Sequence, residues 1–293
     1  MKQTIQKSSA KKRKTVDGIF YGLMVFASVV VGAALAGIIV YILIQSAGST
    51  KLSDAAGSKS LGFLGIRGLL PMIASTAWTV FVSLAIALPV GIMTAIYLQE
   101  YAQKSPVSRF LGLAIDTLAG IPSIIYGLFG LLLFCRFFNL GQSIISGGLT
   151  LSIMILPVII RTTEEALKTV PDSFREGSFS LGATKFQTIV HAVLPPALPG
   201  ILTAAILAVG RVVGESTPVL LTVGIARNLP RTIFEPGRTL TIHLYYLTKE
   251  AVNHDDFANA FTAAAVLIIL ILIINTIVKL LGIGFGHTGE NVD

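Results

Sequence analysis

The chain of 293 residues is dominated by apolar side chains: 53% of its residues are hydrophobic, 13% are charged, and the mean hydropathy is +0.80. An ordinary soluble domain has about 25% charged residues, so this composition excludes a cytosolic enzyme and a disordered protein. The single cysteine, Cys135, excludes a disulfide framework and a cysteine-based zinc site. The net charge of +7 does not indicate nucleic-acid binding, because much of the excess lies in the first fourteen residues.

Residues 1–18 form a basic tail, and residues 19–44 contain no charge. At 1.5 Å per residue the uncharged run is about 39 Å long as a helix, enough to cross a membrane with some tilt. A cleavable signal is the alternative, because residues 34–36 (Ala-Leu-Ala) resemble a cleavage site. The run continues past the length of a signal core, so we predict an uncleaved anchor helix.

Further apolar runs predict additional membrane helices. Only helices and closed barrels satisfy their backbone in lipid, and these runs are too long and unalternating for barrel strands. We therefore predict an all-α integral membrane protein with six spans, whose fourth span continues through Arg161 to Leu167. The runs after the anchor are 72–98, 110–134, 149–160, 196–223 and 257–281.

Six spans place both termini on one side of the membrane. Lys and Arg are more numerous in the segments that lie inside if residues 1–18 are cytoplasmic, although the basic tail supplies most of the bias. We therefore expect a cytoplasmic tail at residues 1–18 and another at residues 282–293.

The sequence lacks the usual marks of chemistry on a bound substrate. It contains no Gly-Lys dipeptide and hence no P-loop, and it contains no G-x-S-x-G elbow. The polar cluster His254-Asp255-Asp256 does not have the spacing of a metal site. We therefore predict no catalytic residue and no bound metal, and a membrane protein that transports or scaffolds.

The segment between the fourth and fifth spans is the most informative. Pro171 cannot continue a helix, so the fourth span should end before it. Ser173 and Glu176 have the Ser-x-x-Glu spacing of a capping box, which predicts a new short helix that Gly182 ends.

This short helix offers apolar side chains at Phe174, Phe179 and Leu181. Such a helix suits a groove on a partner protein. Resting on the lipid surface is the alternative, and the residues alone do not choose between the two.

The spacing of Glu176, Gly182 and Leu194-Pro195 resembles the EAA loop of ABC importer permeases, with departures at Gly177, Ser178 and Ala192. Within that superfamily the chain is similar to the phosphate-importer permeases of the PstA type. The likeness covers residues 70–281. Its strongest motifs are residues 120–127, 161–165, 170–176 and 210–215.

The resemblance implies the MetI-like fold of type I importer permeases over residues 70–281. It implies a homologous PstC-type permease, a PstB-type ATPase homodimer that carries ATP and Mg, and a PstS-type phosphate-binding protein, with no cofactor on this chain. It implies that segment 171–193 docks on the ATPase. The expected coupling residues are Ser173, Phe174, Glu176, Gly177, Ser178, Phe179 and Gly182.

Arg211 and Glu215 lie within the fifth span, where each unpaired charge would cost about 2.5 to 3.5 kcal/mol. Four residues apart on one helix, they can pair. A structural ion pair is one reading. The other is a polar pathway in which Arg211 and Arg161 recognise an oxyanion. Kinship with phosphate permeases favours a translocation role for Arg161, Arg211 and Glu215. Asp116 has no obvious partner and is expected to be a hydrogen-bonding group.

Glycine and proline positions suggest packing seams and hinges. Gly120, Ser123, Gly127 and Gly130 fall at helical spacing in the third span, as a static or sliding seam. Pro218 is expected to kink the fifth span beside Glu215. We expect the third and fifth spans to face the partner permease. The packing or hinge residues are Gly120, Pro122, Ser123, Gly127, Gly210, Gly214 and Pro218.

The outer segment 225–256 mixes acidic and basic residues, which is typical of a solvated surface, and it is also the expected landing place of a binding protein. The function that best fits is the permease subunit of an ATP-driven phosphate importer working by alternating access. Another anion (sulfate, molybdate or phosphonate) and a scaffold that transports nothing remain the alternatives. The expected location is the bacterial inner membrane.

Overall fold

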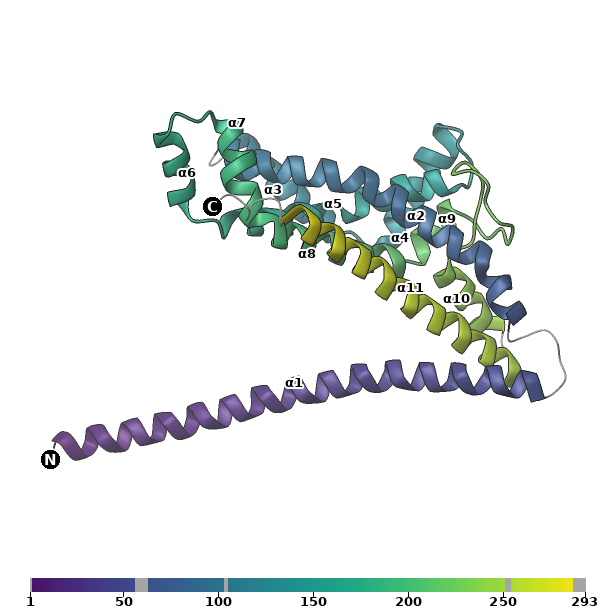
Figure 1. The fold of residues 1–293 in the computed structure, drawn as a ribbon, viewed down its shortest axis with the longest axis horizontal. Helices are drawn as coiled ribbons and strands as arrows, with labels where there is room; N and C mark the ends of the chain where they lie inside the picture. The colour runs from purple at the N-terminus through teal and green to yellow at the C-terminus, as the bar shows by residue number, and fades with distance from the viewer. Residues whose placement is uncertain (1, 56–62, 103–104, 251–253, 287–293) are drawn as a thin grey trace.

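The computed structural model describes residues 2–55, 63–102, 105–250 and 254–286, and within these ranges its regular structure is entirely helical (Figure 1). The longer helices are α1 (Lys2–Ala55), α2 (Phe63–Ile96), α3 (Pro106–Ala119), α5 (Ile144–Lys168), α8 (Leu194–Gly214), α10 (Leu240–Glu250) and α11 (His254–Gly286). The shorter elements are η1 (Tyr97–Tyr101), α4 (Ser123–Gly130), η2 (Leu131–Phe137), α6 (Asp172–Ser180), α7 (Lys185–Thr188), η3 (Ile189–Val193) and α9 (Thr217–Thr222). The prediction of an all-α protein is confirmed.

Five helices in the described part of the chain are long and apolar enough to cross a membrane, and a bent pair adds a sixth crossing if it counts as one span. The five are Phe20–Ala47, Leu69–Tyr101, Ile144–Lys168, Lys185–Gly214 and Phe257–Leu280. The fourth span passes through Arg161 and ends before Pro171, as predicted.

The third predicted span, 110–134, is not one helix. It consists of α3 and the α4–η2 pair, bent by 99° at a break. Pro122 causes the break, because it has no N–H and disfavours a helical conformation at the residue before it. Across the break, the Tyr126 hydroxyl donates to the Leu118 carbonyl at 2.8 Å. Gly120 lies in the break, so the predicted single stripe of small residues was wrong.

The fifth predicted span is also broken, where a kink was expected. Helix α8 ends at Gly214, Glu215 is extended (φ −76°, ψ 130°), and α9 begins at Thr217. Pro218 lies in the first turn of α9, where a helix has no partner for the missing N–H. The proline therefore starts a second helix instead of bending the first.

The two broken spans pack against each other through α4 and α9. A Cβ added at Gly127 would lie 2.9 Å from the Pro218 Cα and 2.9 Å from Leu221 Cδ1. Glycine at this position therefore lets the backbone of α9 approach α4, which confirms a packing role for Gly127.

Helix α5 is the centre of the body, packed against α2 on one side and α8 on the other. Fully buried side chains from α5 and α8 form the main core: Ile144, Leu151, Ile155, Ile159 and Val209. Small hydroxyl side chains in α5 bond back to their own helix, as Thr150 does to the Ser146 carbonyl at 2.7 Å. The core therefore fixes the relative positions of α2, α5 and α8.

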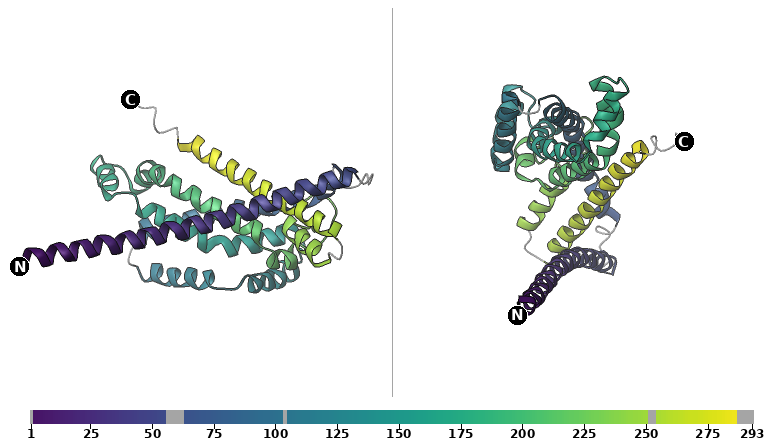
Figure 2. Two further views of the ribbon diagram at one scale, coloured as in Figure 1. Left: turned by 90° about the horizontal axis from the view of Figure 1, so that it is seen from below. Right: turned by 90° about the vertical axis from the view of Figure 1, so that its left-hand side faces the viewer.

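Helix α1 stands away from this body in Figure 1 and in the right-hand view of Figure 2. No residue in the most apolar stretch of its span is buried in the single chain. It meets the body at α11, where the rings of Tyr41 and Phe261 make an edge contact with centroids 5.8 Å apart. An apolar helix with no covering from its own chain is consistent with the predicted anchor in lipid.

The outer segment is more ordered than a solvated loop. Arg238 is only 4% exposed, and its guanidinium carbon lies 4.5 Å from the centroid of the Tyr246 ring. The Leu240 N–H donates to Thr76 Oγ1 of α2 at 2.9 Å. The expectation of a mixed solvated surface was therefore wrong for the part that forms α10, because this helix packs on α2 and α11.

Gly127→Ala should lower the free energy of unfolding by about 1–3 kcal/mol, because the added methyl overlaps the Pro218 backbone. The measurement is the thermal midpoint of the detergent-solubilised protein. Gly32→Ala is the control, since nothing lies within 4 Å of a Cβ added at Gly32. Equal midpoints for the two variants would contradict the tight α4–α9 contact.

Burial and the positive charges of Arg238 and Arg227 lower the pKa of His243 from 6.5 to about 4. Between pH 6.5 and about pH 4, His243 binds a proton in the unfolded chain but not in the folded chain. The free energy of unfolding should therefore fall as the pH decreases through this range. His243→Gln should flatten this pH dependence, measured as unfolding midpoints from pH 7 to 4.5. An unchanged slope in the variant would show that His243 is not the group responsible.

Candidate translocation and coupling sites

Arg161 of α5 lies between two carboxylates. Its Nε and Nη2 donate to Asp116 Oδ1 of α3 at 2.9 and 2.6 Å, and its Nη1 donates to Glu164 Oε2 at 2.8 Å. Nη2 also donates to the Gly112 carbonyl at 3.0 Å. The guanidinium therefore fastens α3 to α5, within a cluster that carries one more negative than positive charge.

Arg211 of α8 is held more loosely. Its Nε lies 3.8 Å from Glu215 Oε1, an ion pair too long to be a hydrogen bond, and its side chain is 39% exposed. The predicted pairing is confirmed, although Glu215 belongs to the break and not to the helix. Arg211 borders an open face of α8. The other exposed residues of that face are Thr203, Leu207, Gly210 and Gly214.

No atom of the described residues lies within 4 Å of a Cβ added at Gly210 or Gly214. Their predicted role in close packing is therefore not fulfilled inside this chain and stays a prediction about a second subunit. Ser123 begins α4, directly after Pro122 at the break in the third span.

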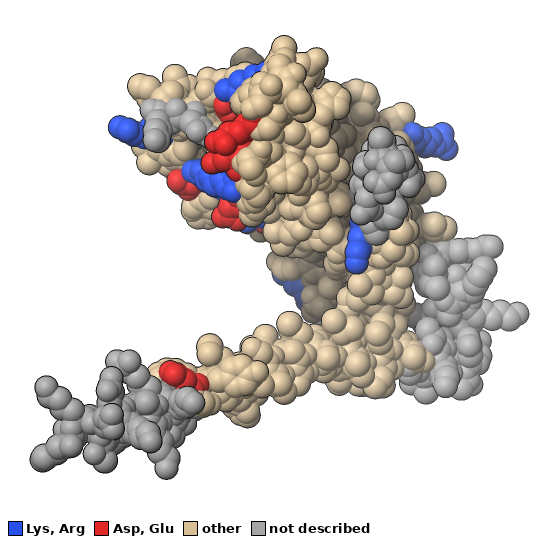
Figure 3. All heavy atoms as spheres, turned by 60° about the vertical axis from the view of Figure 1, so that its left-hand side comes forward, with Lys and Arg blue, Asp and Glu red and all other residues tan. Residues whose placement is uncertain are grey.

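The three residues predicted to line a pathway fall in two places. Arg161 lies toward the end of α5 that leads to α6, whereas Arg211 and Glu215 lie at the end of α8 that leads to α9. Figure 3 shows acidic and basic side chains gathered on the helical body, while the apolar span of α1, Phe20–Ala47, contains no charged residue. The translocation role of these residues stays a prediction.

Asp116 and Glu164 are the partners that sequence reasoning missed. Glu164 follows Arg161 by three positions, so the pair is visible in a helical sequence. Asp116 lies 45 positions away, and only the packing of α3 on α5 brings it to Arg161. The available signal was an acid in an apolar run, which needs a cation nearby.

The predicted short helix between the fourth and fifth spans exists as α6, but it begins differently. Pro171 is its N-cap and the helix starts at Asp172, so the Ser173–Glu176 capping box was wrong. Ser173 already lies inside the first turn and cannot cap it. Gly182 follows the helix with φ +83°, the left-handed conformation that ends a helix, as predicted.

The capping box of this region lies at the start of α7. The Gln187 N–H donates to Thr184 Oγ1 at 3.4 Å, and the Thr184 N–H donates to Gln187 Oε1 at 2.8 Å. Ser178 Oγ and Thr188 Oγ1, 2.9 Å apart, join α6 to α7. The two short helices therefore form one unit.

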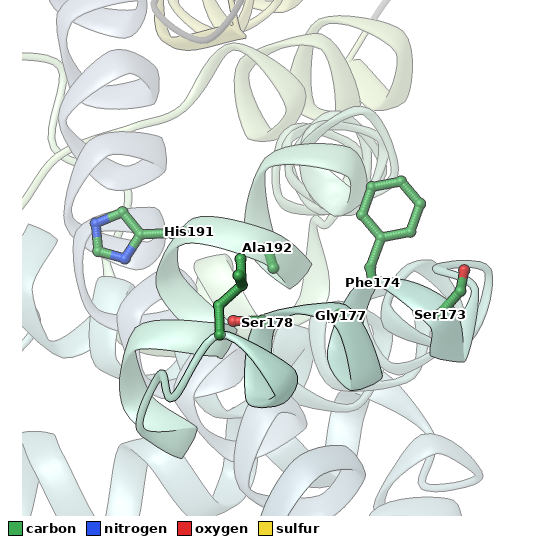
Figure 4. Close-up of a pocket in the computed structure, with 7 residues that line it drawn as sticks. Ser173, Phe174, Gly177, Ser178, His191 and Ala192 are labelled. Carbon is green, nitrogen blue, oxygen red and sulfur yellow. The ribbon is translucent and has the colours of Figure 1, made fainter.

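Large apolar side chains of this unit are exposed. Phe174 is 50% exposed, Phe179 48% and Leu181 91%. An open hollow of about 510 Å³ lies between α6 and η3, where Ser178 and Ala192 lie close together and Phe174 projects from α6 (Figure 4). The Glu176 side chain is exposed, and a Cβ added at Gly177 would have no described atom within 4 Å. This surface is available to a partner protein.

Helix α6 is attached to the membrane helices through Arg175, which the sequence reasoning did not single out. Its side chain is 14% exposed and pairs with Glu100 of η1, which is 7% exposed, at 2.8 Å. A basic residue on an otherwise exposed helix gave no sign of this distant partner. Among the described residues, no group of three His, Cys, Asp or Glu is placed to hold a metal.

In the described part of the chain, helices of membrane-spanning length pack around α5, and the exposed α6–α7 unit lies between α5 and α8. The chain belongs to the family described as "Binding-protein-dependent transport system inner membrane component", whose profile matches residues 87–282. Members of this family are multi-pass membrane permeases without catalytic activity of their own. They operate with an ATPase and a substrate-binding protein.

Relatives of known name agree with this membership. A probable ABC transporter permease protein, YqgI of Bacillus subtilis, is 32% identical over 92% of this chain and 96% of its own length. The phosphate transport system permease protein PstA 1 of Mycobacterium tuberculosis is 39% identical over 66% of this chain and 64% of its own length. PstC of Mesorhizobium japonicum is 28% identical over 90% of this chain and 89% of its own length.

Solved structures share the fold. A chain of the MetNI methionine ABC transporter superposes with a TM-score of 0.56 at 22% identity, covering 80% of this chain and all of that one. A chain of a bacterial ABC transporter that imports alginate gives the same score at 16% identity, covering 85% and 95%. The MetI-like permease fold is therefore confirmed.

Arg161→Ala should lower the free energy of unfolding by about 3 kcal/mol, because it leaves the buried Glu164 carboxylate without a cation. Asp116→Asn should cost at most about 1 kcal/mol, because that carboxylate is 64% exposed. Thermal unfolding of the purified protein measures both. If Asp116→Asn proved the more damaging variant, the assignment of Glu164 as the principal partner would be wrong.

Proposed function

We propose that the chain is one of two transmembrane subunits of an ATP-driven importer of inorganic phosphate. The other subunits are a PstC-type permease, a PstB-type ATPase homodimer that binds ATP and Mg, and a PstS-type phosphate-binding protein. PstA-named relatives at 39% identity support the substrate, and the PstC relative supports a homologous partner. Both termini and the α6–α7 unit lie on the cytoplasmic side of the bacterial inner membrane.

Arg211 carries the assignment of an anion as substrate. It is a cation in an apolar span with its guanidinium partly exposed, and its single carboxylate partner lies 3.8 Å away. A guanidinium held so loosely keeps donors free for a tetrahedral oxyanion. Arg161 is less suited to direct contact with an anion, because two carboxylates already engage it. It contributes by holding α3 against α5.

The other subunits meet this chain at three of its exposed surfaces. The face of α8 that contains Gly210 and Gly214 packs against the partner permease, with small residues allowing close approach. The exposed Phe174, Phe179 and Leu181 enter a cleft of the ATPase. The binding protein lands on the outer segment around Arg227 and Arg231. ATP binding and hydrolysis then switch the pathway between outward- and inward-facing states.

Uptake of radiolabelled phosphate into proteoliposomes that contain the complete complex tests this proposal. Wild-type uptake should require ATP and the binding protein and should resist excess sulfate. Arg211→Ala should reduce uptake by about tenfold or more, the loss expected when a charge-assisted hydrogen bond to the substrate is removed. Arg136→Ala, which removes an exposed arginine at the end of η2, is the control and should retain uptake.

Other outcomes would point to the alternatives. Uptake abolished by sulfate, molybdate or phosphonate would identify another oxyanion as the substrate. An assembled complex that hydrolyses ATP but takes up no anion would contradict the transport function and favour a scaffold. Normal uptake by Arg211→Ala would show that the Arg211–Glu215 ion pair is structural and does not contact the anion.

A further inference from the structure

We propose that Arg175 and Glu100 form the joint through which movement of α6 is passed to α2 and α5. This inference rests on the proposed coupling of α6 to an ATPase. It assigns a positioning role to Arg175 of α6, which lies about 100° around the helix from Phe174, and to Glu100 of η1. The joint consists of one guanidinium, one carboxylate and the carbonyl groups at the end of α5.

The contact with Glu100 is the part that reaches α2. Arg175 Nη2 donates to Glu100 Oε1 at 2.8 Å, and Nε donates to the same oxygen at 3.2 Å. Glu100 belongs to η1, the π-helical continuation of α2. Such paired hydrogen bonds fix the orientation of the guanidinium as well as its position, so the contact resists rotation and sliding.

The contact with α5 supplies a hydrogen-bond donor to a carbonyl group that Pro171 leaves without one. The Leu167 carbonyl would normally accept a hydrogen bond from the N–H four residues later, but that residue is Pro171, which has none. Arg175 Nη2 donates to this carbonyl at 3.1 Å, and Nη1 donates to the Val170 carbonyl at 2.9 Å. The Arg175 side chain therefore binds the last carbonyl groups of the α5 end and the Glu100 carboxylate of η1 at the same time.

A second contact ties the neighbouring helix to the same turn. Tyr101 follows Glu100 directly, and its ring lies 4.7 Å from the Lys185 ammonium at the start of α7. Because Ser178 and Thr188 link α6 to α7, the two η1 residues hold both halves of the unit. A displacement of α6 is therefore transmitted through these contacts to η1 and α5.

The burial of the pair distinguishes it from an ordinary surface salt bridge. The Arg175 and Glu100 side chains are 14% and 7% exposed. The hydrogen bonds that Arg175 donates to the Glu100 carboxylate raise the pKa of Arg175, so the guanidinium stays charged. Loss of Arg175 leaves the buried Glu100 carboxylate without its cation, whereas loss of Glu100 leaves Arg175 with only the exposed Asp172 carboxylate and backbone carbonyls. Asp172, by contrast, touches Arg175 at 3.2 Å and is 87% exposed.

The test uses the complete complex in proteoliposomes and compares Glu100→Gln, Arg175→Lys and Asp172→Asn with wild type. The readout is the ratio of binding-protein-stimulated to basal ATP hydrolysis, together with the amount of complex that assembles. Glu100→Gln should assemble and hydrolyse ATP at the basal rate while the stimulation falls by about tenfold. Arg175→Lys keeps the charge but not the forked contacts, so it should fall between Glu100→Gln and wild type. Asp172→Asn should match wild type.

Wild-type stimulation in assembled Glu100→Gln complexes would overturn the joint. If Glu100→Gln fails to assemble, Arg175→Lys decides: full stimulation in that variant overturns the proposal, and a reduced ratio with normal assembly supports it. The ratio does not depend on which anion is carried. Failure of phosphate uptake in wild type would therefore count against the proposed substrate, not against the joint.

Discussion

A guanidinium removed from water needs carboxylate or carbonyl oxygens around it, and this requirement organises the working parts of the molecule. Arg161 is engaged by two carboxylates and fastens α3 to α5. Arg175 is buried with Glu100 and fastens the docking unit to η1 and α5. Arg211 is met by one distant carboxylate and stays partly open. The degree of compensation therefore separates two structural fasteners from one residue suited to a passing anion.

The two broken spans allow short helices to pack together inside the body. Because Pro122 and Pro218 interrupt two spans, the short helices α4 and α9 can pack together, with Gly127 allowing their close contact. A broken helix leaves backbone groups free within a membrane, which is tolerated where protein or a water-filled cavity surrounds them. The continuous helices α2, α5 and α8 supply most of the main core.

The sequence predicted features that depend on local chemistry and missed those that depend on distant partners. The apolar runs, the end of α5 before Pro171 and the positive φ of Gly182 followed from residue type alone. Whether Pro218 would kink a helix or begin a new one depended on the packing of α4, which no local pattern contains. Asp116, the second carboxylate partner of Arg161, lies 45 positions away, and Glu100, the partner of Arg175, lies 75 positions away, so only the fold could identify these two.

The most direct test of this account is a distance measured between spin labels on α6 and η1 during the ATP cycle. Labels at Ser180 and Tyr97, both exposed, would be introduced into the complete complex after replacing Cys135 with alanine. The account predicts that this distance stays the same in nucleotide-free and ATP-trapped states, while the distance from Ser180 to the docking helix of the partner permease changes. A Ser180–Tyr97 distance that changes as much as the distance between subunits would contradict it.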